Sequence, residues 1–400
     1  MSTIKIEKYI QAPPSEVFLY LTNSTALRDW LCDGATADPK VGGRLYMWWI
    51  GGYYTSGEYL KLEKDKFISF SWFGREEPHA TRVDITLKKE KAGTLLKLAH
   101  RKLGKNSRWI AIGNEYEKQW KKTLDNLVSV LENGADLRIT TRPMLGINTD
   151  LFNASIAEKL NVPIIQGLRI GGVVDGFGAQ KAGLKADDVI SMMDEYEING
   201  AASFGTFIQN KKAGDIVRVT FYRCAEKKTI KMTLSGHPIP PTPASGSELS
   251  KQVETVYKRY ENEIGSLLKD ASEADCAKRP APTEWSANEV LAHLIHSELG
   301  WQNVMTEIIG GHESAADDWG GNIQAHIDGT VATFTTKAEL LKELKNHDAE
   351  TLNMLSHIPS EFLVLKGKFW KLAFQANEYS YHLKTHFEQM RTAIQSARNS

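Results

Sequence analysis

The chain has 400 residues, 42% of them hydrophobic, and 49 basic side chains balance 49 acidic ones. This length predicts about three domains. The neutral charge argues against a general surface for nucleic acid or for an anionic membrane.

We expect a cytoplasmic protein without a membrane span. The sequence contains no run of about 18 apolar residues, and its first residues lack the basic and apolar regions of a secretory signal. Its three cysteines, Cys32, Cys224 and Cys276, are far apart in the chain. This spacing predicts three buried, reduced thiols. The fold class that we predict is multidomain α+β.

Residues 1–136 are predicted to form a domain of helix, antiparallel sheet and long helix. Pro13 and Pro14 favour a helix start, and we expect this helix to carry Trp30. Alternating apolar residues predict strands at residues 44–50, 57–63, 66–73, 81–89 and 93–101. One stripe of the closing helix carries Trp120, Leu124, Leu127 and Leu131.

This order of elements is the plan of a helix-grip fold. The domain resembles the START-like (SRPBCC) superfamily, and within it the homologues of the heat-shock-protein ATPase activator. The resemblance rests on the segments APPSEVF, VGGRLYMWW, GEYLKL, WKKTLDNL and LENG. It implies a small apolar ligand in a cavity or a surface for a partner protein. Trp48, Trp49 and Trp72 are candidates to line that cavity, and simple core packing is the alternative.

Residues 137–238 are organised around GVVDGFGAQKAGLKADDVI, at positions 172–190. An apolar run, a short helix ended by Gly183 and a second apolar run predict strand, helix and strand. With RPMLGI, EING and AGDIVRVTFYR, this segment resembles a PDZ domain of the bacterial kind that follows trypsin-like stress proteases. The implied fold is a small β-sandwich or barrel. No protease segment accompanies it, so proteolysis is not implied.

A PDZ domain adds a peptide to a sheet edge and captures the peptide's carboxylate with backbone N–H groups. Its expected partners are therefore peptide or protein C-termini. The resemblance places the peptide site at Pro143, Met144, Leu145, Gly146, Ile147, Phe204, Phe207 and Ile208. A closed groove in a spacer domain is the alternative.

Residues 239–247 are rich in Pro and Ser and predict a tether, and residues 248–400 are predicted to form an all-α four-helix bundle. His382 and His386 are four residues apart on an apolar stripe of the fourth helix, so both are aimed at the core. Buried imidazoles are costly unless bonded, and one divalent ion, zinc or nickel, would satisfy both. His293 on the second helix is the expected third ligand, and His296 competes with it.

The pattern W-S-x-x-E-V-L-x-H-L followed by H-x-x-x-H-x-x-Q resembles the DinB-like bundle superfamily, with Gln389 as the last residue of the pattern. That superfamily includes S-transferases that use low-molecular-weight thiols, and related isomerases. Three histidine ligands would leave an open position for such a thiol. The sequence shows no dedicated base, so whether the chain is an enzyme stays open.

Two hypotheses follow. The first is a binding or adaptor protein, linked to stress, that combines the three modules. The second is a metal-dependent thiol S-transferase or isomerase whose catalytic domain is the bundle.

Overall fold

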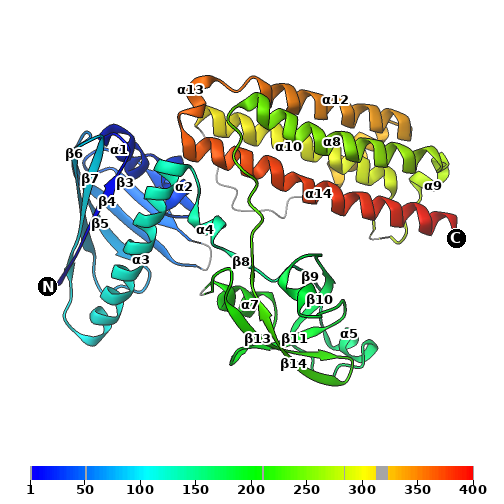
Figure 1. Ribbon diagram of the computed structural model, residues 1–400, viewed down its shortest axis with the longest axis horizontal. Coiled ribbons are helices and arrows are strands. Elements are labelled where there is room, and N and C mark those ends of the chain that lie inside the picture. Colours follow the sequence, from blue (N-terminus) through cyan, green and yellow to red (C-terminus); the bar gives the residue numbers. More distant parts are fainter. Residues whose placement is uncertain (1, 50–51, 210, 283, 312–322, 400) are drawn as a thin grey trace. The chain divides into compact units, whose positions relative to one another are not determined.

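The computed structural model describes residues 2–49, 52–209, 211–282, 284–311 and 323–399, without the side chains of residues 379–381. Positions 1, 50, 210 and 400 belong to predicted elements or domains but lie outside the described residues. The chain forms two compact units, one of residues 1–135 with 240–400 and one of residues 136–239. Figure 1 shows the elements of each unit.

The N-terminal domain is a seven-stranded antiparallel sheet with the order β1-β7-β6-β5-β4-β3-β2. Its strands are β1 (Ser2–Ile10), β2 (Gly34–Ala37), β3 (Arg44–Trp48), β4 (Tyr54–Glu63), β5 (Phe67–Gly74), β6 (Thr81–Glu90) and β7 (Gly93–Leu103). The long helix α3 (Ser107–Asn133) lies along the sheet (Figure 1). The four residues of its predicted stripe are all buried in the domain core. The helix-grip prediction is confirmed.

The first helix of this domain is interrupted, which the sequence analysis missed. Helix α1 (Pro14–Thr22) ends before Asn23, and Trp30 belongs to a second helix, α2 (Ser24–Trp30). Asn23 has extended backbone angles, φ −90° and ψ 133°. Its Oδ1 accepts hydrogen bonds from the N–H groups of Thr25 and Ala26, each at 3.0 Å. A side chain that caps the second helix therefore ends the first one.

The middle domain is a small antiparallel sheet with the path β14-β13-β11-β10-β9, and β12 pairs with β11. Its strands are β8 (Pro143–Met144), β9 (Ile147–Asp150), β10 (Leu168–Val173), β11 (Val189–Met193), β12 (Tyr196–Glu197), β13 (Ile216–Arg223), β14 (Glu226–Thr233) and β15 (Ser235–Gly236). Its helices are α4 (Leu137–Thr140), α5 (Ala154–Lys159), α6 (Gly178–Lys181) and α7 (Ala201–Ile208). Gly183 has φ +82°, the left-handed conformation expected for a residue that ends a helix.

The C-terminal domain contains four long helices that lie side by side (Figure 1). They are α8 (Gly246–Lys269), α10 (Ala287–Gly310), α12 (Lys337–Ser356) and α14 (Lys366–Arg398). Shorter helices are α9 (Glu273–Ala277), α11 (Gln324–Thr333) and α13 (Ser360–Leu363). The predicted capping box starts α10, because Glu289 Oε2 accepts from the N–H of Ser286 at 2.8 Å and Ser286 Oγ accepts from the N–H of Glu289 at 3.2 Å.

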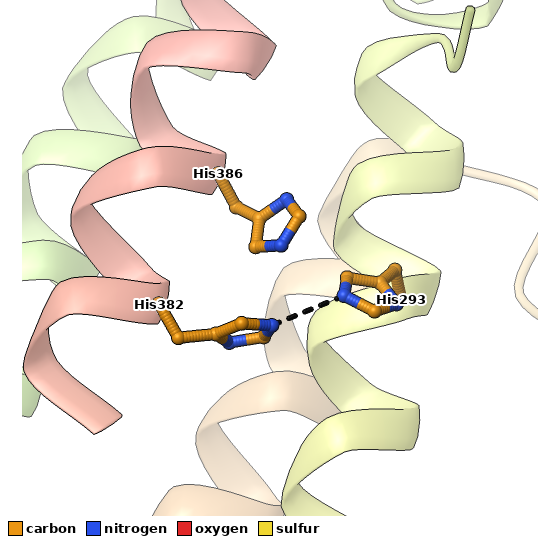
Figure 2. A group of neighbouring side chains, drawn as sticks. All are labelled: His293, His382 and His386. Atoms are coloured by element: carbon orange, nitrogen blue, oxygen red, sulfur yellow. Dashed lines mark hydrogen bonds between the residues drawn. The ribbon is translucent and has the colours of Figure 1, made fainter. Parts of the chain in front are cut away.

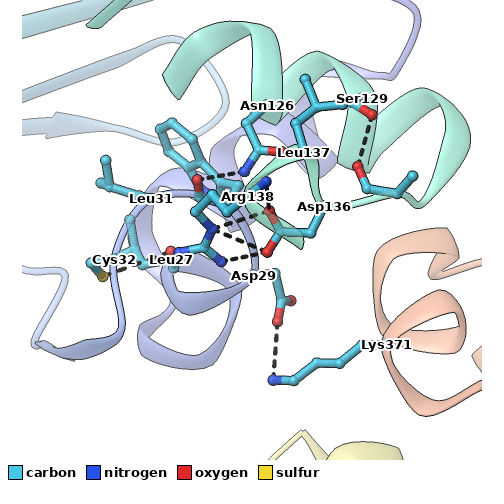
Figure 3. Close-up of polar contacts among 12 residues, drawn as sticks. Leu27, Asp29, Leu31, Cys32, Asn126, Ser129, Asp136, Leu137, Arg138 and Lys371 are labelled. Carbon is cyan, nitrogen blue, oxygen red and sulfur yellow. Dashed lines mark hydrogen bonds and ion pairs between the residues drawn. The ribbon is translucent and has the colours of Figure 1, made fainter. Parts of the chain in front are cut away.

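Helix α14 also contacts the N-terminal domain, in the same compact unit. Lys368 Nζ lies 2.9 Å from Asp29 Oδ2, and both side chains are buried. Lys371 Nζ lies 3.5 Å from Asp29 Oδ1 (Figure 3). Near this ion pair, Asn126 Nδ2 donates to the backbone oxygen of Trp30 at 2.8 Å. The buried charges therefore connect α2 with the helix that carries His382 and His386.

The prediction of three buried cysteines is wrong for one of them. Cys32 and Cys276 are buried, but Cys224 is exposed. It stands in the turn between β13 and β14 with φ +52°, where the chain reverses on the surface. Within the described part of the chain, every helix falls short of the length or apolar character that a membrane crossing requires.

One carboxyl group is buried deep in the bundle. Asp348 on α12 is buried, and burial, followed by the negative charges of Glu298 and Glu261, raises the pKa of Asp348 to about 9. Glu298 is also buried and accepts hydrogen bonds from Tyr257 at 3.0 Å and from Thr351 at 2.8 Å. At neutral pH Asp348 is therefore protonated.

The Asp348→Asn variant tests this pKa. An unfolded Asp has a pKa of about 3.9, so the folded protein binds the proton more tightly. Below about pH 3.9 this proton stabilises the folded protein fully. As the pH rises from there through about 9, the free energy of unfolding falls by at most ~1.4 kcal/mol per pH unit. We expect the melting temperature of Asp348→Asn to fall less than that of the wild type between about pH 5 and pH 9. Glu263→Gln, an exposed change on α8, should follow the wild type. Equal pH profiles for Asp348→Asn and wild type would contradict the assignment.

Candidate metal centre

Three imidazoles from two helices meet inside the bundle. His293 projects from α10, and His382 and His386 project from α14 (Figure 2). One ring nitrogen of each lies within 4.8 Å of the other two. The Nε2 atoms of His293 and His382 are 3.1 Å apart. Two ligand nitrogens at about 2.0–2.1 Å from a tetrahedral Zn²⁺ are about 3.3 Å apart, so this spacing suits a shared ion.

The local sequence explains why these side chains face one another. His382 and His386 are one helical turn apart and share a face. That face continues into the buried residues Leu372, Ala376 and Met390. On the facing helix, His293 meets both partners, with ring centroids at 5.2 Å from His382 and 4.5 Å from His386. The structure thus brings together the three histidines that the sequence singled out.

The competing residue, His296, lies elsewhere. Its ring centroid is 3.9 Å from that of His326 on α11. His296 is half-buried, and burial and His326 lower its pKa. His296, one helical turn after His293, therefore points at a different neighbour.

The three clustered imidazoles are neutral at physiological pH. Burial, followed by the neighbouring histidines, lowers the pKa of His293 to about 3. Burial and His386 lower the pKa of His382 to about 4, and burial lowers the pKa of His386. Neutral imidazole is the form that binds metals. His293 Nδ1 is buried and has no hydrogen-bond partner among the described residues.

Two neighbours orient the cluster. His386 Nδ1 donates to Gln389 Oε1 at 2.9 Å, which leaves the Nε2 lone pair of His386 for a ligand. The ring of Trp285 lies 4.9 Å from that of His293. Trp285 Nε1 in turn donates to Gln324 Oε1 at 3.0 Å, so the indole is held in place beside the histidines.

The middle domain has a groove where the peptide site is expected. It has a volume of about 300 Å³ and is lined by Arg142, Pro143, Met144, Leu145, Gly146, Ile147, Thr149, Phe204, Ile208 and His237. Strand β9 ends the sheet path and, among the described strands, pairs only with β10. Gly146 has φ +79°, and a side chain there would collide with Phe177.

The groove differs from the prediction in two ways. Phe207 does not line it, because its ring is buried and packs beside Tyr196 at 6.0 Å. His237 lines it although the sequence analysis did not select it. The pairing of Gly236 with Pro143 carries His237 to the groove, and no local pattern signals this pairing of residues about 90 positions apart.

Family models match all three parts of the chain. "Activator of Hsp90 ATPase homolog 1-like protein" (AHSA1) matches residues 11–132, "PDZ domain" matches residues 143–234, and "DinB superfamily" matches residues 257–390. The chain is a three-domain protein with AHSA1, PDZ and DinB domains.

The PDZ domain is similar to segments of known proteases. The chain is 32% identical over 113 residues to the "Probable periplasmic serine protease do/HhoA-like" of Haemophilus influenzae, and the match covers 28% of this chain and 23% of that protein. It is 32% identical over 115 residues to the "Serine protease Do-like HtrA" of Lactococcus lactis subsp. lactis, and this match covers 28% of this chain and 28% of that protein. The chain therefore spans about a quarter of the length of these curated relatives.

The AHSA1 domain is similar to solved structures. One is the solution structure of the Aha1 dimer from Colwellia psychrerythraea, with 20% identity, a TM-score of 0.31, and coverage of 34% of this chain and 98% of that one. Another is an HSP90 activator from Plasmodium falciparum, with 23% identity, a TM-score of 0.29, and coverage of 33% and 96%.

In the AHSA1 domain, the three candidate cavity residues do not form one group. The rings of Trp49 and Trp72 lie 6.3 Å apart, and Trp72 is buried. Trp48 follows the alternation of β3 to the face opposite the buried residues Leu45 and Met47. It packs instead against Gly34, where an added side chain would overlap its indole.

Changing Gln389 tests how the DinB cluster is oriented. We expect Gln389→Leu to lower the affinity of the cluster for Zn²⁺ by about 10- to 100-fold, because the tautomer of His386 is no longer held. Gln389→Glu, which keeps the acceptor, should retain the affinity. Zn²⁺ titration against a competing chelator measures both. An unchanged affinity in Gln389→Leu would show that this hydrogen bond does not orient His386.

Proposed function

We propose that this chain is a binding protein, an adaptor, whose DinB domain holds one divalent metal ion and whose PDZ domain holds the C-terminus of a partner. The observation that carries the proposal is the convergence of three neutral imidazoles on one point in the bundle. Burying three imidazoles costs free energy that hydrogen bonds between them recover only in part. A metal ion offsets that cost, which supports a metal-binding role for His293, His382 and His386.

The donor set favours zinc or nickel. Nitrogen ligands from imidazoles suit both ions, and three protein ligands leave a position for a fourth. When bound there, such an ion supplies a positive charge that polarises or activates a molecule in the open position. The chain's own contribution is to hold the imidazoles neutral and aimed at one point.

The PDZ groove supports the second half of the proposal. The edge of β9 can accept an extended peptide as an added strand, and the loop from Pro143 to Gly146 can present N–H groups to its carboxylate. Phe204 and Ile208 line the groove and make its side-chain pocket apolar. We therefore propose partners with a free C-terminus and an apolar last residue.

The AHSA1 domain would add a third binding function. We propose that it takes a small apolar ligand or a partner protein, as its resemblance implies, with Trp49 and Trp72 on the ligand side. A stress-linked role follows only from the resemblance of the modules, and it is part of the proposal.

A metal-dependent thiol S-transferase or isomerase is the second candidate function. It is favoured by the half-buried state of all three histidines, which leaves the cluster reachable from solvent. A thiol at the open position would bind as thiolate, because a metal ion lowers the pKa of a ligating thiol. A screen of the full chain with Zn²⁺, a low-molecular-weight thiol and an electrophile distinguishes the two. Turnover in the wild type that is lost in His382→Ala favours the enzyme. No turnover in the wild type favours the binding protein.

The histidine variants test the metal site. We expect purified His382→Ala or His386→Ala to lose the ion, because two imidazoles alone hold a divalent ion weakly. His296→Ala should keep one ion per chain, because its ring contacts His326 instead. Elemental analysis after dialysis against Zn²⁺ measures the content. Equal metal content in wild type and His382→Ala would refute the site.

The pH dependence of binding follows from the lowered pKa values. Ordinary imidazoles would lose the ion below about pH 6. The pKa of His293 is about 3 and that of His382 about 4, and burial also lowers the pKa of His386, so protons compete with the ion only at a pH lower than for ordinary imidazoles. We therefore expect the dissociation constant for Zn²⁺ to rise only below the pH at which exposed imidazoles would lose the ion. A steep rise already at about pH 6 would contradict these pKa values.

Peptide chemistry tests the PDZ groove. Peptides that end in an apolar residue with a free carboxylate should bind, and amidation should weaken binding by at least about tenfold, since the carboxylate partner of the loop is removed. Phe204→Ala should also weaken binding, while Ile216→Ala, an exposed change on β13, should not. Fluorescence anisotropy with labelled peptides measures each affinity. Equal affinity for the free and the amidated peptide would contradict the assignment of this groove as a carboxylate-binding site.

A further inference from the structure

The sheet of the PDZ domain has a second open edge, at β14. In the sheet path β14 is the end strand opposite β9, and among the described strands it pairs only with β13. A pocket with a volume of about 580 Å³ lies at the C-terminal end of this edge. It is lined by the chain from Lys231 to Gly236 and, among other residues, by Gly178 and Lys181 of α6.

The hydrogen-bond pattern shows which main-chain groups of β14 face this edge. In an antiparallel ladder, only every second pair of residues exchanges hydrogen bonds. One residue beyond the last pair of the register, the N–H of Leu234 donates to the backbone oxygen of Asp215 at 2.8 Å. The bonded residues of β14 are therefore the even-numbered ones. The N–H and C=O groups of Lys227, Thr229 and Lys231 consequently point away from β13, toward the open edge.

Helix α6 marks where this edge ends. A Cβ placed on Gly178 would lie 2.1 Å from the backbone oxygen of Thr233, so α6 packs directly against an outward-facing carbonyl group. The N–H of Gly178 also donates to Ser235 Oγ at 2.8 Å. An added strand can therefore pair with β14 as far as Lys231, and its end would reach the pocket beside α6.

The side chains along this edge are basic. Lys227 and Lys231 are four residues apart on the strand, so they point to the same face of the sheet, and both are exposed. Both ionisable side chains that line the pocket, Lys181 and Lys231, are cations. Lysines at an open edge oppose pairing with a strand of like charge, whereas opposite charges across two strands attract. The edge therefore favours a strand with acidic side chains.

The other face of β14 offers an apolar contact. Met232 is buried, Phe177 is half-buried, and both line the pocket. Successive side chains of a strand point to opposite faces. A strand added to β14 would thus place alternate side chains beside the lysines and the others on the side of Met232.

We propose that the edge of β14 and this pocket bind an extended peptide segment in which acidic and apolar residues alternate, added to the sheet as a further strand. Main-chain pairing with Lys227, Thr229 and Lys231 holds the segment, and its carboxylates lie beside Lys181 and Lys231. No terminal carboxylate takes part, so the segment can lie inside a partner chain. This site is separate from the groove at β9 and does not depend on a bound metal.

Peptide binding to the full chain tests the proposal. The probe has about six residues, a common strand length, with Glu and Val in alternation. Its ends are acetylated and amidated, so it has no terminal carboxylate for the loop beside β9. At low ionic strength we expect this peptide to bind and a peptide with Lys in place of Glu not to bind, because its charges repel the lysines of the edge. Calorimetry measures both affinities.

Charge reversal locates the site. The double change Lys181→Glu with Lys231→Glu should weaken binding by at least about tenfold, because two attractions become repulsions. Lys159→Glu, the same change at an exposed residue of α5, should leave binding unchanged. Phe204→Ala should also leave it unchanged, so a failure of the groove at β9 is distinguishable from a failure of this site.

Methylated peptides distinguish strand addition from attraction between charges alone. An N-methyl group removes a main-chain donor, and only alternate N–H groups of an added strand face β14. Methylation of one alternate set of amides should abolish binding, and methylation of the other set should not. Four results would each overturn the proposal: no binding of the Glu peptide, equally tight binding of the Lys peptide, equal affinities of the two methylated peptides, or full affinity in the double variant.

Discussion

The cost of removing polar groups from water governs the interior of this protein. A buried ionisable side chain must find a partner or give up its charge. Asp348 gives up its charge, as its pKa of about 9 shows. Asp29 and Lys368 keep their charges and pair at 2.9 Å. Removing one partner of such a pair typically costs about 3–5 kcal/mol, because the other charge is then left buried and unpaired.

The same rule distinguishes a structural histidine from one of the proposed metal ligands. His100, in the core of the AHSA1 domain, is fully buried, and burial lowers its pKa to about 3. Both of its ring nitrogens are satisfied, because Nδ1 accepts from Trp120 at 3.2 Å and Nε2 lies 2.7 Å from Thr81 Oγ1. His293 has an equally low pKa but keeps a buried Nδ1 without a partner in the described residues. The geometry also differs, because His293 Nε2 faces another imidazole nitrogen, His382 Nε2, at 3.1 Å, an arrangement that one metal ion could bridge.

The recognition that we propose for this chain takes two physical forms. In the PDZ domain, the edge of β9 and a backbone loop would offer main-chain groups to a peptide, so affinity would come from hydrogen bonds common to all sequences. In the DinB domain, the proposed ligands of the metal ion are side chains held between helices, and their chemistry would select the ion. Helix α14 carries two of the three histidines and also Lys368, which pairs with Asp29, so one helix takes part in both clusters.

Sequence patterns alone determined the local elements and the faces on which residues lie. The i, i+4 spacing aligned His382 with His386, and the Ser286–Glu289 pair located the start of α10, because both depend on a few adjacent turns of chain. Tertiary structure decided which distant faces meet. It selected His293 over His296, moved Phe207 into the core and Trp48 to the outer face, and brought His237 into the groove through strand pairing. These outcomes depend on register and packing between segments far apart in the chain, which local periodicity does not encode.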